Sequence, residues 1–323
     1  MTIGHHLQEL DGLPAYDFPR AATGQGEPAA LPAPETVAWR VSVDSYESDE
    51  SWPDAFTRFT ETVDLTQVRA LIVGCWSDPY EEAPTQIVAA LLAARDRLPA
   101  LRALFFGDIV VEECEISWIV QGDLTPLLDG FPRLESFAVR GATGLLFPAV
   151  RHERLRSLTI ESGGLPARVV RGVAASDFPA LEYLDLWLGT GDYGGDAQVA
   201  DLEPFLTGGG LPALRSLSLR NSEIQDEIAA AFATAPVVTR LETLDLSMGV
   251  LTDAGATALL AGQPLTHLKK LDLRHNYLTP AVKDRLREAL APAGVHLDLD
   301  AGDAEEDRES QEGTVWRYVA VGE

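Results

Sequence analysis

The chain has 323 residues, of which 46% are hydrophobic and 23% are charged, so it contains enough apolar material for a continuous core. Its 50 acidic and 25 basic residues give a formal net charge of −25. This charge argues against nucleic acid and anionic membrane as partners, because both are bound through basic side chains. A basic protein partner fits the charge, and so does solubility alone.

The first 36 residues are predicted to form a capping segment and a linker. The opening residues, MTIGHHLQEL, lack a basic region followed by an apolar run, so no signal peptide is expected. Residues 1–18 are expected to dock on the first unit of the next domain through Ile3, Leu7, Leu10 and Phe18. Residues 19–36 are rich in Pro, Ala and Gly, which predicts an extended linker.

Residues 37–299 repeat one pattern, in which an apolar residue is followed by two residues, an apolar residue, one residue and a third apolar residue. The eight copies fall on Val68/Leu71/Val73, Leu101/Leu104/Phe106, Leu134/Phe137/Val139, Leu155/Leu158/Ile160, Leu181/Leu184/Leu186, Leu214/Leu217/Leu219, Leu241/Leu244/Leu246 and Leu268/Leu271/Leu273. Residues 37–43 and 295–299 are expected to add a strand at each end. The pattern predicts an α/β solenoid, a horseshoe with a parallel concave sheet of about 8–10 strands and helices on the convex side.

The segments between the strands carry helix signals. Residues 52–63 and 84–98 place apolar side chains on one stripe. Thr252 precedes a third helix, and Thr279 with Pro280 forms the start of a fourth. Each helix is expected to bury its apolar stripe against the sheet.

The clearest copies resemble a known family. The residues LxxLDLxxNxLTPAV at 268–282 and LxxLDLSMGVLTDAGA at 241–256 resemble the helix-containing leucine-rich repeats of the ribonuclease-inhibitor type. The asparagine that this type has three residues after the third apolar position occurs only as Asn276, so a less regular coil is expected.

A second resemblance covers the whole chain, including the opening MTIGHHLQELDGLPAYDFP and the closing RYVAVGE. The chain resembles an uncharacterised bacterial cytosolic leucine-rich-repeat family. That family is associated with gene clusters that include a radical-SAM protein and an ATP-grasp-like protein. The resemblance implies an accessory or recognition subunit and supplies no catalytic residues.

Residues 300–323 are predicted to form an acidic tail and a C-terminal capping strand. Residues 300–313 carry seven acidic residues and one arginine, which is typical of a solvated tail. Residues 315–321, VWRYVAV, are strongly strand-like. Pairing with the edge of the sheet is expected, and docking on a partner is the alternative.

Candidate partner-binding residues lie on the predicted concave face, between the buried leucines. Aromatic side chains with charged neighbours are typical of binding hot spots. They are Phe105, Tyr183, Asp185, Trp187, Arg220, Asp245, Asp272 and Arg274. The alternative is that the aspartates of the LDL triplets are ordinary repeat residues, stabilised by Lys270 and neighbouring arginines.

Three long repeats place extra residues after the strand, at residues 76–84, 107–123 and 189–197. All three insertions are predicted to emerge along one rim, at the carboxyl ends of the parallel strands, where α/β sheets tend to bind ligands. Their candidate contact residues are Trp76, Tyr80, Trp118 and Tyr193.

No motif of a catalytic, phosphate-binding or metal-binding site occurs, and the six histidines are scattered, so no catalytic residue, metal or cofactor is predicted. Cys75 and Cys114 have no metal-ligand spacing, which indicates a reduced, cytoplasmic protein. The sequence predicts a non-catalytic scaffold that binds a protein through the concave face and the rim of residues 68–210. The alternatives are an accessory or substrate-binding subunit of a bacterial modification system and an acidic inhibitor of a basic enzyme.

Overall fold

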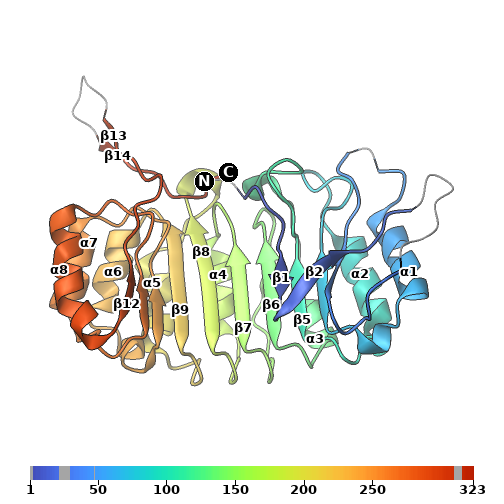
Figure 1. Ribbon diagram of the computed structural model, residues 1–323, viewed down its shortest axis with the longest axis horizontal. Helices are drawn as coiled ribbons and strands as arrows, with labels where there is room; N and C mark the ends of the chain where they lie inside the picture. The colour runs from blue at the N-terminus through green and yellow to red at the C-terminus, as the bar shows by residue number, and fades with distance from the viewer. Residues whose placement is uncertain (1–2, 22–29, 47, 309–314) are drawn as a thin grey trace.

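The computed structural model describes residues 3–21, 30–46, 48–308 and 315–323. Within them, twelve strands form one open sheet in the order β1 to β12 (Figure 1). Strand β1 is antiparallel to β2, and every later pair is parallel. The predicted α/β solenoid is confirmed, with a sheet of twelve strands in place of about 8–10.

The ten predicted strands are present in register. For example, Leu244 is the partner of Leu217 on one side and of Leu271 on the other. The strands of the sheet are β1 (Glu9–Leu10), β2 (Leu13–Asp17), β3 (Ala38–Val41), β4 (Ala70–Val73), β5 (Ala103–Phe106), β6 (Ser136–Arg140), β7 (Ser157–Glu161), β8 (Tyr183–Gly189), β9 (Ser216–Ser222), β10 (Thr243–Asp245), β11 (Lys270–Asp272) and β12 (His296–Asp298).

Helices cover one side of this sheet and leave the other side as the inner face of the curve (Figure 1). The α-helices are α1 (Trp52–Thr62), α2 (Thr85–Ala94), α3 (Thr125–Gly130), α4 (Ala167–Ala175), α5 (Val199–Thr207), α6 (Gln225–Phe232), α7 (Asp253–Ala261) and α8 (Pro280–Leu290). Short 3-10 turns occupy Leu65–Gln67, Arg95–Arg97, Ile116–Trp118, Gly191–Tyr193, Pro236–Arg240 and Ala291–Ala293. No helix in the described ranges is both long and apolar enough to cross a membrane.

The core lies between the sheet and the helices. The second apolar residue of each repeat, for example Leu104, Leu158 and Leu244, is fully buried there. Because the repeats stack in register, these side chains form a continuous ladder that each helix covers in turn. The other face of the strands is the concave surface on which the candidate binding residues were predicted.

The N-terminal segment reaches further than a cap on the first repeat. Phe18 packs on Trp39 and Phe59 of that repeat, as expected, with ring centroids 6.4 and 5.2 Å apart. Leu10, however, belongs to an apolar cluster on the concave face with Ile72 and other residues of β3 to β6. The segment therefore covers part of the inner face as well as the end of the core.

The expectation that residues 315–321 pair with the sheet edge is wrong. Strand β14 (Val315–Trp316) pairs with β13 (Asp307–Arg308) in a separate hairpin that projects from the solenoid (Figure 1). Residues 317–323 then run along the rim at the carboxyl ends of the strands. Ile3 and Val321 meet in one apolar cluster, so the two ends of the chain lie together above the middle of the sheet (Figure 1).

Candidate protein-binding surface

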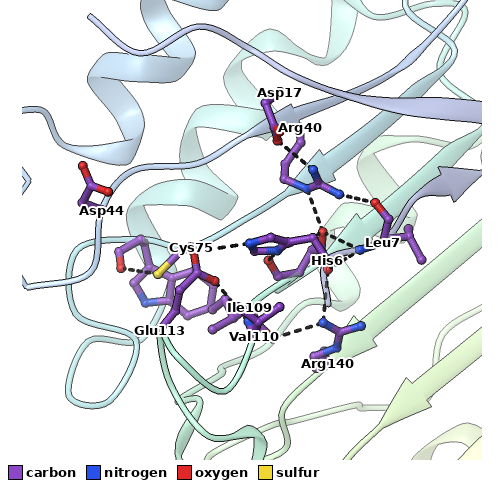
Figure 2. Close-up of polar contacts among 12 residues, drawn as sticks. His6, Leu7, Asp17, Arg40, Asp44, Cys75, Ile109, Val110, Glu113 and Arg140 are labelled. Atoms are coloured by element: carbon purple, nitrogen blue, oxygen red, sulfur yellow. Dashed lines mark hydrogen bonds and ion pairs between the residues drawn. The ribbon is translucent and has the colours of Figure 1, made fainter. Parts of the chain in front are cut away.

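A buried carboxylate fixes the N-terminal segment to the concave face, and its partners Leu7, Arg40 and Arg140 are drawn in Figure 2. Asp108 is fully buried, and its oxygens lie 2.7 Å from Nε of Arg40 and 3.1 Å from Nη1 of Arg140. The backbone N–H of Leu7 donates to the same carboxylate at 3.1 Å, and Arg40 also donates to the carbonyl of Leu7. With its acceptor sites used in this way, Asp108 acts as a structural anchor.

His6 adds a titratable contact to this anchor. Its Nδ1 is 3.6 Å from the Asp108 carboxylate, and its Nε2 is 3.7 Å from the Glu113 carboxylate. The hydrogen bond with Asp108 raises the pKa of His6, and burial raises the pKa of Glu113. Burial opposes ionisation of Asp108, but the hydrogen bond with His6 and the charges of Arg140 and Arg40 outweigh it and lower that pKa.

Replacing His6 with glutamine should reduce stability more at pH 6 than at pH 8.5. A histidine whose pKa is raised by folding stabilises the fold below its unfolded value near 6.5 and loses that contribution as the pH rises through the folded value. The pH-dependent part should be roughly 0.5 kcal/mol, because the ring is partly exposed and water screens the pair. Urea unfolding of both proteins at both pH values measures it. His5→Gln, at an exposed neighbour, is the control, and an equal loss at both pH values would contradict the prediction.

The anchored segment removes Phe105 from the accessible surface. Phe105 was expected to face outward on the concave sheet, but it is buried in the cluster that Leu10 closes. The guanidinium of Arg140 covers its ring at 5.2 Å from the centroid. In this structure Phe105 therefore lacks the exposure that a direct partner contact requires.

The half of the concave face formed by β7 to β12 carries the other predicted residues. Arg220 donates to both oxygens of Asp185, at 3.0 and 2.6 Å, and the hydroxyl of Tyr183 donates to Asp185 at 3.0 Å. Burial raises the pKa of Tyr183, and the Asp185 charge adds to the shift, so this hydroxyl remains a donor. The arrangement is a preorganised polar patch with Tyr183 half-buried at its edge.

Two further aspartates continue this patch toward the C-terminal repeats. Asp272 is buried, 2.9 Å from Nζ of Lys270 and 3.5 Å from Nε of Arg274. Burial raises the pKa of Asp245, Arg220 opposes the shift, and the Asp272 charge adds to it. The aspartates are thus internal partners of the cations, while Arg274 is exposed to solvent. Their pairing agrees with the alternative that they are repeat residues, and a role in binding stays a prediction.

Trp187 was also expected to be exposed, and it is buried instead. Arg220 lies over its ring at 4.8 Å, and the C-terminal segment covers it through Ala320 and Val321. Its indole Nε1 is buried without a hydrogen-bond partner among the described residues. The surface that the sequence assigned to Trp187 is occupied by the chain itself.

The rim insertions bring three of their four predicted aromatics together. Tyr80 and Trp118 have ring centroids 5.7 Å apart, and Trp118 and Tyr193 lie 6.2 Å apart at 82°. Tyr80 and Trp118 are 48% and 42% exposed. The fourth residue, Trp76, is buried against Phe106 and donates its Nε1–H to the carbonyl of Glu82, so it supports the loop from inside. Tyr80, Trp118 and Tyr193 are called the rim aromatic cluster below.

The surroundings of the rim aromatic cluster are acidic. Residues 42–51, 74–84, 107–123 and 189–197, which follow β3, β4, β5 and β8, contain fourteen Asp and Glu residues and no Lys, Arg or His. The hydroxyl of Tyr193 donates to the Glu323 carboxylate, which raises the tyrosine pKa to about 12. A partner at this site meets aromatic faces within a negative field.

Sequence reasoning missed Tyr46, which is exposed in the loop after β3 on the same rim. Its position directly after a predicted strand was the available signal. Cys75 and Cys114 are free and buried, and burial raises both thiol pKa values, to about 11 for Cys114. No group of three or more His, Cys, Asp or Glu side chains suited to a metal occurs in the part of the chain that the structure describes.

Comparisons with known proteins agree with this architecture. A family model described as Leucine Rich repeat matches residues 211–233, 239–260 and 265–281. Among solved structures, the chain is similar to a Bacteroides fragilis protein whose crystal structure was determined as a structural-genomics target. The TM-score is 0.72 at 32% sequence identity, covering 80% of this chain and 74% of that chain. A search of the curated proteins gave no match.

Proposed function

Because this chain belongs to the leucine-rich-repeat proteins, we propose that it is a non-catalytic scaffold that binds a partner protein. Leucine-rich-repeat domains generally mediate contacts between proteins, which supports this role. The contact surface comprises the rim aromatic cluster together with Tyr183 and Arg220 on the concave face. Asp185 is buried and holds these two side chains in place through hydrogen bonds. The exposure of Tyr80 and Trp118 and the ring contacts that join them to the half-buried Tyr193 are the observation that carries the proposal.

Aromatic clusters of this kind suit a hot spot. Tyrosine and tryptophan bring large contact areas at a low entropic cost, and they dominate measured interface energies. The cluster is assembled from three loops on a rigid sheet, so its geometry is set before a partner arrives and little ordering energy is lost on binding. Single exposed aromatics are common on protein surfaces, whereas three in contact are unusual enough to indicate a binding site.

The partner in this proposal is basic. The rim loops carry fourteen Asp and Glu residues and no cation of their own, and the whole chain has a net charge of −25. Cations from other segments pair with some of these carboxylates, for example Arg40 with Asp108. Such a field accelerates encounter with a positively charged protein and weakens as salt is added. Lys and Arg side chains also interact favourably with exposed Trp and Tyr faces.

Trp118→Ala should reduce capture of the partner by about tenfold or more, because truncation of a hot-spot aromatic costs about 2 kcal/mol or more and about 1.4 kcal/mol is already tenfold. The test is quantitative affinity capture from native lysate with the wild-type chain and variants as bait. Trp316→Ala is the matched control, because Trp316 is 51% exposed but lies on the separate β13–β14 hairpin. Undiminished capture of every protein by Trp118→Ala would contradict the proposal, as would capture that does not fall between low and moderate salt.

The alternatives raised by the sequence use the same surfaces. An accessory subunit of a modification system would capture an enzyme of that system, and an acidic inhibitor would capture and inactivate a basic enzyme. The identity of the captured protein separates them. A cytoplasmic location completes the proposal, and the two free buried thiols suit a reducing compartment.

A further inference from the structure

The C-terminal segment is held in a manner that resembles the binding of a separate peptide. Residues 317–323 lie in an extended path along the rim. The path begins at the loops that follow β11 and β10 and at the end of β9, and it ends at the loops that follow β8 and β5. Two side chains each form a pair of hydrogen bonds with the backbone of one tail residue. Tyr277 accepts from the N–H of Tyr318 and donates to its carbonyl, both at 2.9 Å.

Asn221 forms an equivalent pair of hydrogen bonds three residues further along the tail. Tyr277 and Asn221 are called the clamps below. Its Nδ2 donates to the carbonyl of Val321 at 2.6 Å, and its Oδ1 accepts from the N–H of Val321 at 2.9 Å. Between the two clamps, the N–H of Ala320 donates to the carbonyl of Met248 at 2.8 Å. These contacts recognise main-chain atoms, which every extended peptide presents, as when a peptide adds to a sheet edge.

Asn221 and Met248, which both hold the tail, belong to the repeat architecture. Asn221, Met248 and His275 occupy equivalent positions in three consecutive repeats, and each has a positive φ, of 55°, 67° and 46°. Such conformations are uncommon for residues other than glycine, although asparagine and histidine adopt them more readily than methionine. This backbone turn recurs after three successive strands, so it is set by the solenoid. Asn221 contacts the tail through its side chain and Met248 through its carbonyl.

The groove requires a small side chain at the position of Ala320. Ala320 is only 2% exposed and packs beside Trp187 and Met248, while the large Tyr318 points into solvent. At the far end, Gly163 leaves room for the carbonyl of Gly322, since a Cβ there would lie 2.1 Å from that oxygen. The hydroxyl of Ser117 donates to the same carbonyl.

From these contacts we propose that the rim contains an extended-peptide groove whose resident occupant is the chain's own C-terminal segment. A partner segment enters when the tail leaves. The partner segment has a small residue where Ala320 lies and a free N–H, hence no proline, where Val321 lies. The unpartnered Nε1 of Trp187 beneath Ala320 marks a donor that the resident tail leaves unused. The groove adjoins the rim aromatic cluster, because the hydroxyl of Tyr193 donates to Glu323 at the end of the tail. The two proposals are tested separately, the cluster by partner capture with Trp118→Ala and the groove by peptide titration.

The test uses the full chain carrying Ala320→Trp and Val321→Pro, two changes that exclude its own tail from the groove. Ala320→Trp places a bulky side chain at a buried position. Val321→Pro removes the N–H that donates to Asn221. A fluorescein-labelled peptide RYVAVGE, the sequence of residues 317–323, is titrated against it and followed by fluorescence anisotropy. Saturable one-to-one binding is expected. Binding to the wild-type chain should be at least tenfold weaker, because the tethered tail competes at high effective concentration.

Two controls address the clamp. In the first control, the peptide carries proline in place of Val321, and it should bind at least tenfold more weakly. In the second, the original peptide is titrated against the double variant that also carries Asn221→Ala, and binding should again be at least tenfold weaker. Each change removes hydrogen bonds to buried groups. No binding to a double variant that retains its circular dichroism and cooperative unfolding would overturn the proposal. Equal binding by the wild-type chain and the double variant would also overturn it.

A measurement on the wild-type chain covers the case in which the double variant fails to fold. Unlabelled peptide at increasing concentration should speed deuterium uptake at residues 317–323, because displacement frees the N–H groups of Tyr318, Ala320 and Val321. Uptake that does not change with peptide concentration would contradict exchange in the groove.

Discussion

Replacing Asp108 with alanine is expected to destabilise the protein by about 3–5 kcal/mol, because it removes the shared carboxylate of two buried arginines. Arg40 retains Asp17, and Arg140 retains Glu161 at 2.7 Å, but both guanidinium groups lose their contact with the central charge. The backbone N–H of Leu7 also loses its acceptor. Urea unfolding at pH 7 measures the change in the free energy of unfolding.

The control is Asp17→Ala, which removes the other carboxylate that contacts Arg40. Asp17 is 72% exposed, so its loss should cost less than about 1 kcal/mol. The difference between wild type and Asp108→Ala should shrink as the pH falls. A carboxyl whose pKa is lowered by folding contributes its stability above the unfolded value and loses it as the pH falls through the folded value. A cost for Asp108→Ala no larger than that for Asp17→Ala would show that the anchor does not stabilise the fold.

Replacing Gly172 with alanine is expected to destabilise the protein by about 1–3 kcal/mol, although the same change inside a helix usually stabilises it by about 0.5–1 kcal/mol. Gly172 lies within α4, where a Cβ would come 1.7 Å from the backbone carbonyl oxygen of Phe147. No change of rotamer can relieve a clash between a Cβ and a backbone atom, so the helix must shift away from the preceding loop.

Thermal and urea unfolding of Gly172→Ala measure this effect, with Gly209→Ala as the control. A Cβ at Gly209 would meet no atom within 4 Å, and its substitution should change the free energy of unfolding by less than about 0.5 kcal/mol. A stabilised Gly172→Ala variant would mean that α4 and the loop at Phe147 are free to separate.

The repeat pattern was sufficient to predict the solenoid and its register. Three apolar positions per strand leave one way to bury them all, so the pairing of Leu104 with Leu71 and Phe137 follows from their spacing. Strands β1 and β2 were not predicted as members of the sheet, because LPAYD has no copy of the repeat pattern. Strand β2 pairs with β3 although the predicted linker, residues 19–36, separates them in the sequence.

The sequence predicted which side chains lie on the concave face but not which of them are exposed. Phe105 and Trp187 lie on the predicted side of their strands and are nevertheless covered by the two ends of the chain. The covering contacts join residues about a hundred positions apart, such as Leu7 with Asp108 and Val321 with Asn221. The repeat pattern describes residues close in the sequence and carries no information about such distant contacts. It therefore predicts that Phe105 and Trp187 are exposed to solvent.

The rim was predicted from the length of its insertions, and the structure adds the proximity of their side chains. Trp118 follows β5 and Tyr193 follows β8, so two strands intervene between their repeats. The long loop that carries Trp118 extends past β6 and β7 to reach Tyr193. The spacing of the apolar residues does not predict the path of such a loop. The assignment of these aromatics to partner binding stays a prediction, and Trp118→Ala is its test.

The meeting of the two termini above the middle of the sheet changes how the repeats depend on one another. In an ordinary solenoid each repeat contacts only its neighbours, and terminal repeats fray independently. Here Ser117 bonds to Gly322 across 205 positions, and Ile3 packs on the apolar cluster that contains Ile116 and Val321, so loops from both halves of the solenoid are tied at one point. Because unfolding at either end of the solenoid breaks contacts that also hold the other end, we expect unfolding to proceed as a single cooperative transition.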